Sequence, residues 1–288
     1  MGWLAAMVFA GVRWLRFLSP MACSDALRSS KEVSVKRSTL ILAVLVALTG
    51  CKKSNQVDID NGAGGNNDQT LPACADGVGP GTQGAVMAHV GRLGGGCFWV
   101  DDTEVTRAQY AEMVAAKPSN VADCQGQNPS FDPLPAIDLT ESDLPVSGVD
   151  WCDASAYCAW AGKRLCGTYT AATGDVSELE STCTDGDGGS FRYADDLSIG
   201  SGNCGGNAAT PSEVKFHAKC VTPTGVYDLA GNVREWTAEC EAAGCATRGG
   251  SYASTSSDDF GCKAKTTLPR ASARADVGFR CCAEDAAK

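Results

Sequence analysis

Cysteine is the residue that most limits what this chain can fold into. The chain has 288 residues and 16 cysteines, and fourteen of these lie between Cys74 and Cys282. These cysteines do not form the Cys-x-x-Cys pairs of zinc sites. Sixteen free thiols would be unusual in a reduced cytosolic protein of this size, so the sequence indicates an oxidising compartment. Fourteen cysteines can close seven disulfides with no thiol left over, although the sequence leaves their connectivity open.

The first 51 residues are typical of an export signal. Lys36 and Arg37 precede an apolar stretch over residues 40–48, and Thr49-Gly50-Cys51 follows. A charged start, a short apolar core and a small-residue exit are the parts of a secretory signal. Leu48-Thr-Gly-Cys51 resembles a bacterial lipobox, which implies that Cys51 carries a lipid and becomes the mature N-terminus. The alternative is a single transmembrane helix, but about 20 apolar residues are needed to cross a bilayer.

The segments around this signal suggest three parts in the chain. Residues 1–35 are unusually long for the start of a signal, so residues 1–50 are interpreted as a signal region with an over-extended start, translation beginning near Val33 or Val35. Residues 52–84 are rich in Gly, Asn, Asp and Gln and predict a flexible tether. Cys74 is expected to pin the end of the tether. One compact domain is expected over residues 85–288.

The charge balance excludes one class of partner. From Cys51 onward the chain holds 18 of its 24 basic residues and 32 of its 34 acidic residues, a net charge of −14. A surface this acidic repels phosphate backbones and attracts cations, so nucleic acid is excluded as a partner and metal ions are favoured. A solvated acidic surface without a ligand is the alternative.

Two helices and a strand can be predicted from capping and periodicity. Cys97–Val100 has the composition of a short strand. Thr106 and Gln109 form a capping box for a helix to about residue 116, with Tyr110, Met113 and Val114 on one face. Asp150 caps a second helix that Gly162 ends. Residues 167–224 show little periodicity and predict loops held by disulfides. Cys240 and Cys245 are expected to close a small loop.

Six motifs in a fixed order carry a resemblance to a known family. They are Glu104-Val-Thr-x-x-Gln-Tyr110, Pro145-Val-Ser-Gly-Val-Asp-Trp151, the segment 156–165, Gly225-Val-Tyr-Asp-Leu-Ala-Gly-Asn-Val-Arg-Glu-Trp236, Arg248-Gly-Gly-Ser-Tyr252 and Gly278-Phe-Arg280. Over residues 92–283 the chain resembles the formylglycine-generating enzyme family, also called the sulfatase-modifying factor family. The resemblance implies an α+β fold, a variant of the C-type-lectin fold with little regular secondary structure. It also implies a copper-dependent oxidase that converts a protein cysteine to formylglycine.

The residues that would hold copper are replaced in this chain. The two copper cysteines of the family fall on Ser254 and Asp259. A hydroxyl and a carboxylate do not hold copper(I) as thiolates do, so we expect no copper and no catalytic residue. The resemblance implies instead that Cys262 is a structural disulfide cysteine and that Cys158 pairs with Cys281.

The chain also departs from the family after Leu165. A helix is typical of the family there, and in this chain it is expected to be short or missing. Four cysteines in and after this region suggest a disulfide-rich insertion; they are Cys166, Cys183, Cys204 and Cys220.

The resemblance implies one calcium site. Its ligands would be side-chain oxygens of Asp228 and Glu235 and the backbone carbonyls of Gly231 and Val233. A hard cation prefers several oxygens, and a glycine-containing turn between two carboxylates supplies them. The alternative is a turn without metal, in which Asp228 and Asn232 bond nearby amides and Glu235 pairs with an arginine such as Arg248.

Other catalytic centres are not supported. His89 and His217 are the only histidines, so an iron site with several histidines is excluded, and no Gly-x-Ser-x-Gly elbow is present. The sequence therefore predicts a lipid-anchored cell-envelope protein, attached to the membrane through Cys51, whose domain binds an unknown envelope protein or glycan. Two alternatives stay open: an active oxidase that uses Cys262 and Cys282, and a lectin-like glycan binder.

Overall fold

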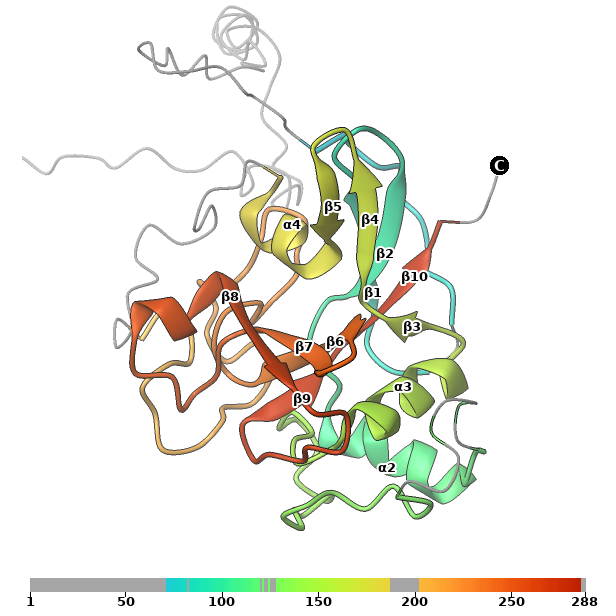
Figure 1. Ribbon diagram of the computed structural model, residues 1–288, viewed down its shortest axis with the longest axis vertical. Coiled ribbons are helices and arrows are strands. Elements are labelled where there is room, and N and C mark those ends of the chain that lie inside the picture. The colour runs from blue at the N-terminus through green and yellow to red at the C-terminus, as the bar shows by residue number, and fades with distance from the viewer. Residues whose placement is uncertain are drawn as a thin grey trace, which may run out of the picture. The chain divides into compact units, whose positions relative to one another are not determined.

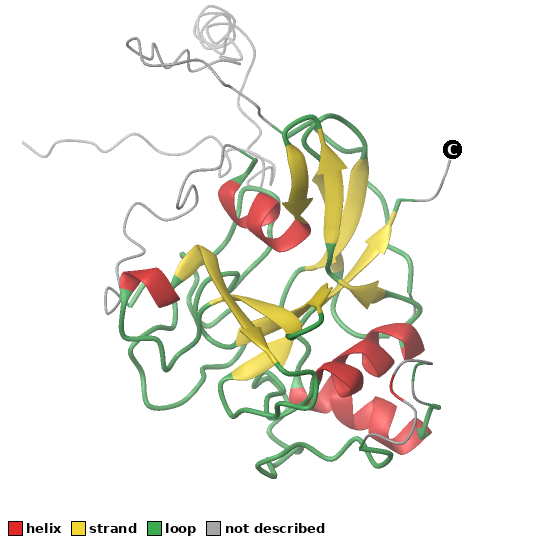
Figure 2. Cartoon of the chain, in the orientation of Figure 1, coloured by secondary structure: helices red, strands yellow, loops and turns green. Residues whose placement is uncertain are grey.

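Three small sheets, three short α-helices and long loops make up the part of the chain that the computed structural model describes (Figure 2). That part is residues 71–285 without 82, 120, 122, 123, 125–127 and 187–201, and it lies in one unit spanning Gly65–Lys288. The predicted signal, Cys51 and residues 52–70 of the predicted tether lie outside the described residues. No helix within the described ranges has the length and apolar character needed to cross a bilayer.

The first sheet brings the start and the end of the domain together. Its order is β1-β2-β10-β3, and all neighbours are antiparallel. The strands are β1 (Met87–Gly91), β2 (Cys97–Asp101), β10 (Cys281–Glu284) and β3 (Arg164–Leu165). β2 confirms the strand predicted at residues 97–100 and is one residue longer.

The second sheet carries the C-terminal motifs. Its order is β8-β7-β6-β9, with β6 and β9 parallel and the other pairs antiparallel. The strands are β6 (Arg234–Glu241), β7 (Gly244–Gly249), β8 (Gly261–Leu268) and β9 (Val277–Phe279). A short 3₁₀ helix, η3 (Ser257–Asp259), precedes β8. Arg280 lies between β9 and β10, and therefore at the junction of the two large sheets.

Both helices predicted from capping are present. The helix α2 (Arg107–Ala116) begins after the capping box of Thr106 and Gln109, and Tyr110 and Met113 are buried on its inner face. The helix α3 (Trp151–Trp160) begins after Asp150, and Gly162 follows its end at φ 74°. The two helices lie side by side at one end of the domain (Figure 1). They cover a core cluster that includes Val105, Tyr157, Trp236 and Phe279.

The segment after Leu165 is more regular than the sequence predicted. The pair β4 (Thr168–Ala171) and β5 (Gly174–Ser177) forms a hairpin, and the helix α4 (Glu178–Thr184) follows it. The prediction of loops alone is wrong here, because exposed hairpin residues show no hydrophobic periodicity. The helix α4 has seven residues, which agrees with the expectation of a short or missing helix in this region. The β4–β5 hairpin lies in the expected insertion and is called the inserted hairpin.

All fourteen cysteines from Cys74 to Cys282 are paired. The seven disulfides are Cys74–Cys97, Cys124–Cys152, Cys158–Cys281, Cys166–Cys282, Cys183–Cys262, Cys204–Cys220 and Cys240–Cys245. The predicted pairs Cys158–Cys281 and Cys240–Cys245 are confirmed, and so is the structural role of Cys262. Cys74 also pins its segment to β2, as expected. Two cysteines of the expected insertion, Cys166 and Cys183, are bonded to cysteines outside it.

Candidate functional site

A tight turn before β6 positions the predicted calcium ligands. Asp228 and Asn232 adopt left-handed backbone conformations with φ of 57° and 51°, and Gly231 has φ of 92°. A Cβ on Gly231 would lie 2.5 Å from the carbonyl oxygen of Gly205, so only glycine fits this position. The amide of Asn232 donates to the same carbonyl at 2.7 Å. The chain is therefore folded around a fixed set of oxygens.

Three buried carboxyl groups gather beside this turn. Glu235 accepts two hydrogen bonds from Arg280, from Nε to Oε2 and from Nη2 to Oε1, both at 2.7 Å. Oδ2 of Asp228 accepts the amide of Lys215 at 2.8 Å, whereas its Oδ1 is buried without a hydrogen-bond partner. Both oxygens of Glu104 are also buried without a partner. Glu104 is fully buried.

The electrostatics of this cluster favour an additional positive charge. Burial raises the pKa of Asp228 to about 6, against the opposing Lys215 amide and Arg280 charge. Burial and the charge of Asp228 raise the pKa of Glu104 well above its usual range. Burial raises the pKa of Glu235 too, although Arg280 opposes the shift. One guanidinium thus compensates three carboxyl groups incompletely, because only Glu235 is paired with it.

The residues present fit the calcium ion that the family resemblance implies. Asp228 offers an unpartnered oxygen, and the oxygens of Glu235 keep lone pairs beyond those that accept from Arg280. Glu104 adds two unpartnered oxygens that the sequence did not point to. Its one sequence signal is its place as the first residue of the motif Glu104-Val-Thr-x-x-Gln-Tyr110.

The contacts of the metal-free alternative are also present: Asp228 and Asn232 accept the backbone amides of Lys215 and Ser212 at 2.8 and 2.9 Å. Glu235 pairs with an arginine, which is Arg280; Arg248 pairs with Glu239 and Glu180 instead.

The two positions expected for copper lie together, and polar groups fill them. Oγ of Ser254 lies 2.7 Å from the carbonyl oxygen of Asp259 and 3.1 Å from its Oδ2. Arg234 holds the same carboxylate with Nη2 at 2.9 Å and Nη1 at 3.1 Å. Nε of Arg234 also lies 3.2 Å from Oδ2 of Asp276. The donors at this place are a hydroxyl, carboxylates and a guanidinium, which do not fit copper(I).

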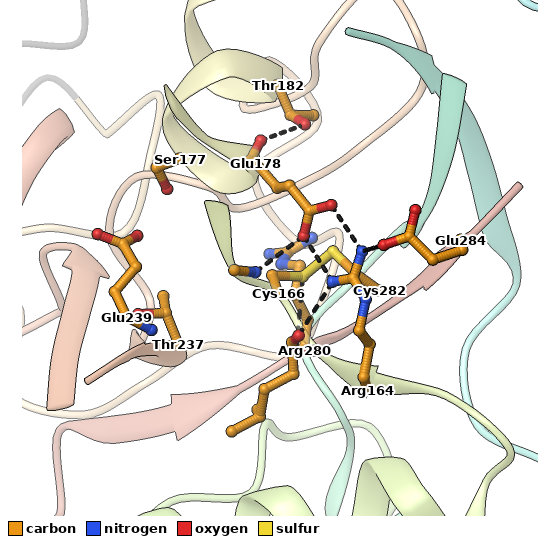
Figure 3. Close-up of polar contacts among 12 residues, drawn as sticks. Arg164, Cys166, Ser177, Glu178, Thr182, Thr237, Glu239, Arg280, Cys282 and Glu284 are labelled. Atoms are coloured by element: carbon orange, nitrogen blue, oxygen red, sulfur yellow. Dashed lines mark hydrogen bonds and ion pairs between the residues drawn. A yellow bond between two sulfur atoms is a disulfide. The ribbon is translucent and has the colours of Figure 1, made fainter. Parts of the chain in front are cut away.

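The cysteines proposed for an alternative oxidase do not form a pair. Cys262 is bonded to Cys183, and Cys282 is bonded to Cys166. The second disulfide is buried beside the carboxylate of Glu178, which binds both terminal nitrogens of Arg164 at 2.6 and 2.7 Å (Figure 3). The amide of Gly167 also donates to Glu178 at 2.8 Å. This network attaches the inserted hairpin and α4 to β3 and β10.

Comparison with known proteins identifies the family of the domain. The family model described as "Sulfatase-modifying factor enzyme 1-like domain" matches residues 89–285, more than half of the chain. The chain belongs to this family. Its α+β fold, rich in disulfides and poor in helix, is therefore the formylglycine-generating-enzyme variant of the C-type-lectin fold.

Individual relatives are more distant. The chain is similar to the inactive C-alpha-formylglycine-generating enzyme 2 of Mus musculus, at 32% identity over 48% of this chain and 49% of the relative. The protein of the same name from Bos taurus is also 32% identical, over 48% and 50%. The chain thus spans about half the length of the curated relatives it matches. Among solved structures, PvdO from Pseudomonas aeruginosa has a TM-score of 0.49 and 19% identity, covering 65% of this chain and 80% of that one.

Proposed function

We propose that this chain is a lipid-anchored cell-envelope protein whose sulfatase-modifying-factor-like domain is a non-catalytic, calcium-stabilised binding module. The observation that carries the proposal is the arrangement at the expected copper positions, where Ser254 and Asp259 are held by Arg234. The seven disulfides also leave no cysteine between Cys74 and Cys282 for a copper site. The word "inactive" in the names of the two mammalian relatives supports the same reading for this chain.

Two measurements test the loss of catalysis. We expect no free thiol in the unfolded, unreduced mature protein that begins at Cys51, because the lipid would occupy the sulfur of Cys51 itself. We also expect no aldehyde product when the protein is incubated with copper, oxygen and a cysteine-containing sulfatase peptide. Two or more free thiols, or an aldehyde detected by mass spectrometry, would restore the oxidase reading. The double variant Ser254→Cys/Asp259→Cys is the matched control, since it puts thiols back at both positions.

Calcium would compensate the charge that Arg280 leaves uncompensated in the buried carboxyl cluster. Asp228, Glu235 and the carbonyls of Gly231 and Val233 would hold it, with Glu104 beside them. We expect a chelator to lower the melting temperature of the protein and added calcium to restore it. Asp228→Asn should be insensitive to the chelator, whereas Asp258→Asn, at an exposed position, should respond as the unchanged protein does. An unchanged melting temperature in chelator would rule the site out.

The membrane anchor is proposed from the sequence signal alone. Cys51, after the apolar segment 40–48, would carry the lipid. Expression in a bacterial host with a radiolabelled fatty acid should label the protein and place it in the detergent-soluble membrane fraction. The Cys51→Ser variant should remain unlabelled. Equal labelling of both proteins would contradict the anchor.

Glycan binding is a second candidate, favoured by one cavity. A cavity of about 560 Å³ lies between the inserted hairpin, α4 and strands β6 to β8. Its walls include the carboxylates of Asp175, Glu180, Glu239 and Glu241 and the cations of Arg248 and Lys265. Such polar groups can bond sugar hydroxyls. A glycan array should give signals that the Asp175→Asn/Glu241→Gln variant loses, and an array without signal ends this candidate.

A further inference from the structure

The cavity between the inserted hairpin, α4 and strands β6 to β8 has an unbalanced charge. Its volume of about 560 Å³ lies within the range of about 300–1,000 Å³ that is usual for ligand sites. Four carboxylates and two cations line it, so two negative charges are left over. A molecule that enters this cavity therefore meets a negative potential.

The buried side of the cavity is an ion-pair network that is already complete. Arg248 donates to both oxygens of Glu239, from Nε at 2.7 Å and from Nη2 at 2.9 Å, and its Nη1 donates to Glu180 at 2.7 Å. The side chains of Arg248 and Glu239 are only 9% and 7% exposed. Burial alone would raise the pKa of Glu239, but the hydrogen bonds and charge of Arg248 lower it below its usual value. Nζ of Lys265 lies 3.2 Å from the same carboxylate, and Ser177 lies beside it (Figure 3). Both cations are thus paired within the protein.

The open side of the cavity holds the two carboxylates that are not compensated. Asp175 of β5 and Glu241 at the end of β6 are exposed and line the same cavity. The ion pairs formed within the described ranges include neither of them. Oγ1 of Thr170 donates to Oδ1 of Asp175 at 2.8 Å and so fixes the position of that carboxylate. Asp175 and Glu241 are therefore available to a positively charged ligand.

The two walls of the cavity are held together by backbone contacts and disulfides. One wall is the inserted hairpin and the other is β6. The amide of Ala238 in β6 donates to the carbonyl of Cys166, just before the hairpin, at 2.7 Å. The disulfide Cys240–Cys245 joins β6 to β7 at the same place, and Cys240 lines the cavity. The cavity is therefore formed before a ligand arrives, which reduces the entropy cost of binding.

The charge of the cavity distinguishes between classes of glycan. Sialylated, sulfated and phosphorylated glycans are anionic, so the uncompensated carboxylates repel them. Neutral sugars can donate hydroxyls to the carboxylates but leave both charges in place. A protonated amino group donates up to three hydrogen bonds, and hydrogen bonds between charged groups are stronger than neutral ones. A glycan with free amino groups is therefore the best match.

We propose that this cavity binds glycans that carry free, protonated amino groups, and that Asp175 and Glu241 receive the ammonium. The inference rests on the glycan-binding candidate and names its ligand class. The hydroxyl of Thr168, which also lines the cavity, can bond a ring hydroxyl of the same sugar. The acidic charge of the whole chain attracts such a ligand at long range.

The test compares two sugars that differ only at their amino groups. Isothermal titration at mildly acidic pH should show binding of the tetramer of glucosamine, whose amino groups are protonated. The tetramer of N-acetylglucosamine is uncharged and should bind about tenfold more weakly, the product of two exposed ion pairs of about threefold each. Added salt should weaken only the binding of the glucosamine tetramer. Equal affinity for the two tetramers would overturn the proposal.

Three variants locate the binding in the cavity. Asp175→Asn and Glu241→Gln should each weaken the binding of the glucosamine tetramer by about threefold. Glu112→Gln removes the same charge at an exposed position of α2, outside the cavity, and should leave binding unchanged. Equal losses in all three variants would show that only the net charge of the protein attracts the sugar, and the proposed site would be wrong.

Further outcomes separate this inference from the broader glycan candidate. If the N-acetylated tetramer binds as tightly and Asp175→Asn/Glu241→Gln loses it, the cavity binds glycans but needs no amino group. If neither tetramer binds, this inference fails, and the glycan array decides the broader candidate. Tetralysine carries the same ammonium groups on a peptide and should bind more weakly, because it has no ring hydroxyls. Equal or tighter binding of tetralysine would overturn the assignment to sugars in favour of a basic peptide.

Discussion

At the scale of single residues, Arg280 contributes most to holding the candidate site together. It is fully buried, and it donates to both oxygens of Glu235 as well as to the carbonyls of Asp101 and Tyr227, at 3.1 and 2.8 Å. Removing one partner of a buried ion pair leaves the other charge uncompensated, which costs about 3–5 kcal/mol. We expect Arg280→Met to lower the free energy of unfolding in urea by this amount, with Lys263→Met, at an exposed position, as the control. A loss below about 1 kcal/mol would contradict this role.

Asp153 gives the domain a pH dependence that can be isolated. Burial and the charge of Asp150 raise the pKa of Asp153 to about 7 from 3.8. The folded state therefore keeps a proton that the unfolded state releases, so the contribution of Asp153 to stability is complete below pH 4 and is lost as the pH rises to about 7. Asp153→Asn lacks this titration. Relative to the unchanged protein, the variant should gain stability between pH 4 and pH 7 in urea titrations, and a constant difference would contradict the shift.

The residues of the site were only partly predictable. Asp228, Gly231, Ser254 and Asp259 follow from family spacing, and the structure brings the last two together. Glu104 was missed because a carboxyl group after a strand is usually exposed, and only tertiary packing makes this one fully buried. The partner of Glu235 was also missed, since Arg280 and Glu235 are far apart in the sequence and meet only where the two large sheets join.

At the scale of elements, a helix was predictable where a cap and a helical period occur together. α2 and α3 have both signals, whereas α4 was not predicted although Ser177 and Glu180 have the spacing of a capping box. Seven residues are too few to show a helical period. The pairing of β6 with β9 is parallel and joins residues far apart in the sequence, so no local sequence pattern predicts it.

The inserted hairpin should depend on one tyrosine. The hydroxyl of Tyr169 accepts the amide of Leu93 at 3.0 Å and lies 3.0 Å from Oγ of Ser181, so it joins β4 to the β1–β2 loop and to α4. Tyr169→Phe keeps the ring and removes both bonds, which should cost about 1–2 kcal/mol. Hydrogen exchange should become faster at the Leu93 amide, while the Tyr110 amide within α2 stays protected. Unchanged exchange at Leu93 would contradict the contact.

At the scale of the whole molecule, two long-range disulfides act as one unit. Cys158–Cys281 and Cys166–Cys282 join residues 123 and 116 positions apart, and they end on adjacent cysteines of β10. While one of them is present, the other closes only a short ring through residues 158–166. Removing either disulfide alone therefore increases the conformational entropy of the unfolded chain only slightly.

Removing both disulfides should cost more than the two separate losses added together. When both disulfides are removed, Cys183–Cys262 is the long-range bond that still joins these two parts of the chain. The chain between Cys183 and the residues 158–166, and the chain between Cys262 and β10, are then unconstrained in the unfolded state. The disulfide that is removed second therefore closes a larger ring than the one removed first. Because loop-closure entropy rises with the logarithm of loop length, its loss costs about 1 kcal/mol more. Packing losses should largely cancel, because Cys158 and Cys281 belong to one core cluster and Cys166 and Cys282 to another. Urea unfolding of Cys158→Ala/Cys281→Ala, of Cys166→Ala/Cys282→Ala and of the quadruple variant measures this excess, and strictly additive losses would show that the two bonds act independently.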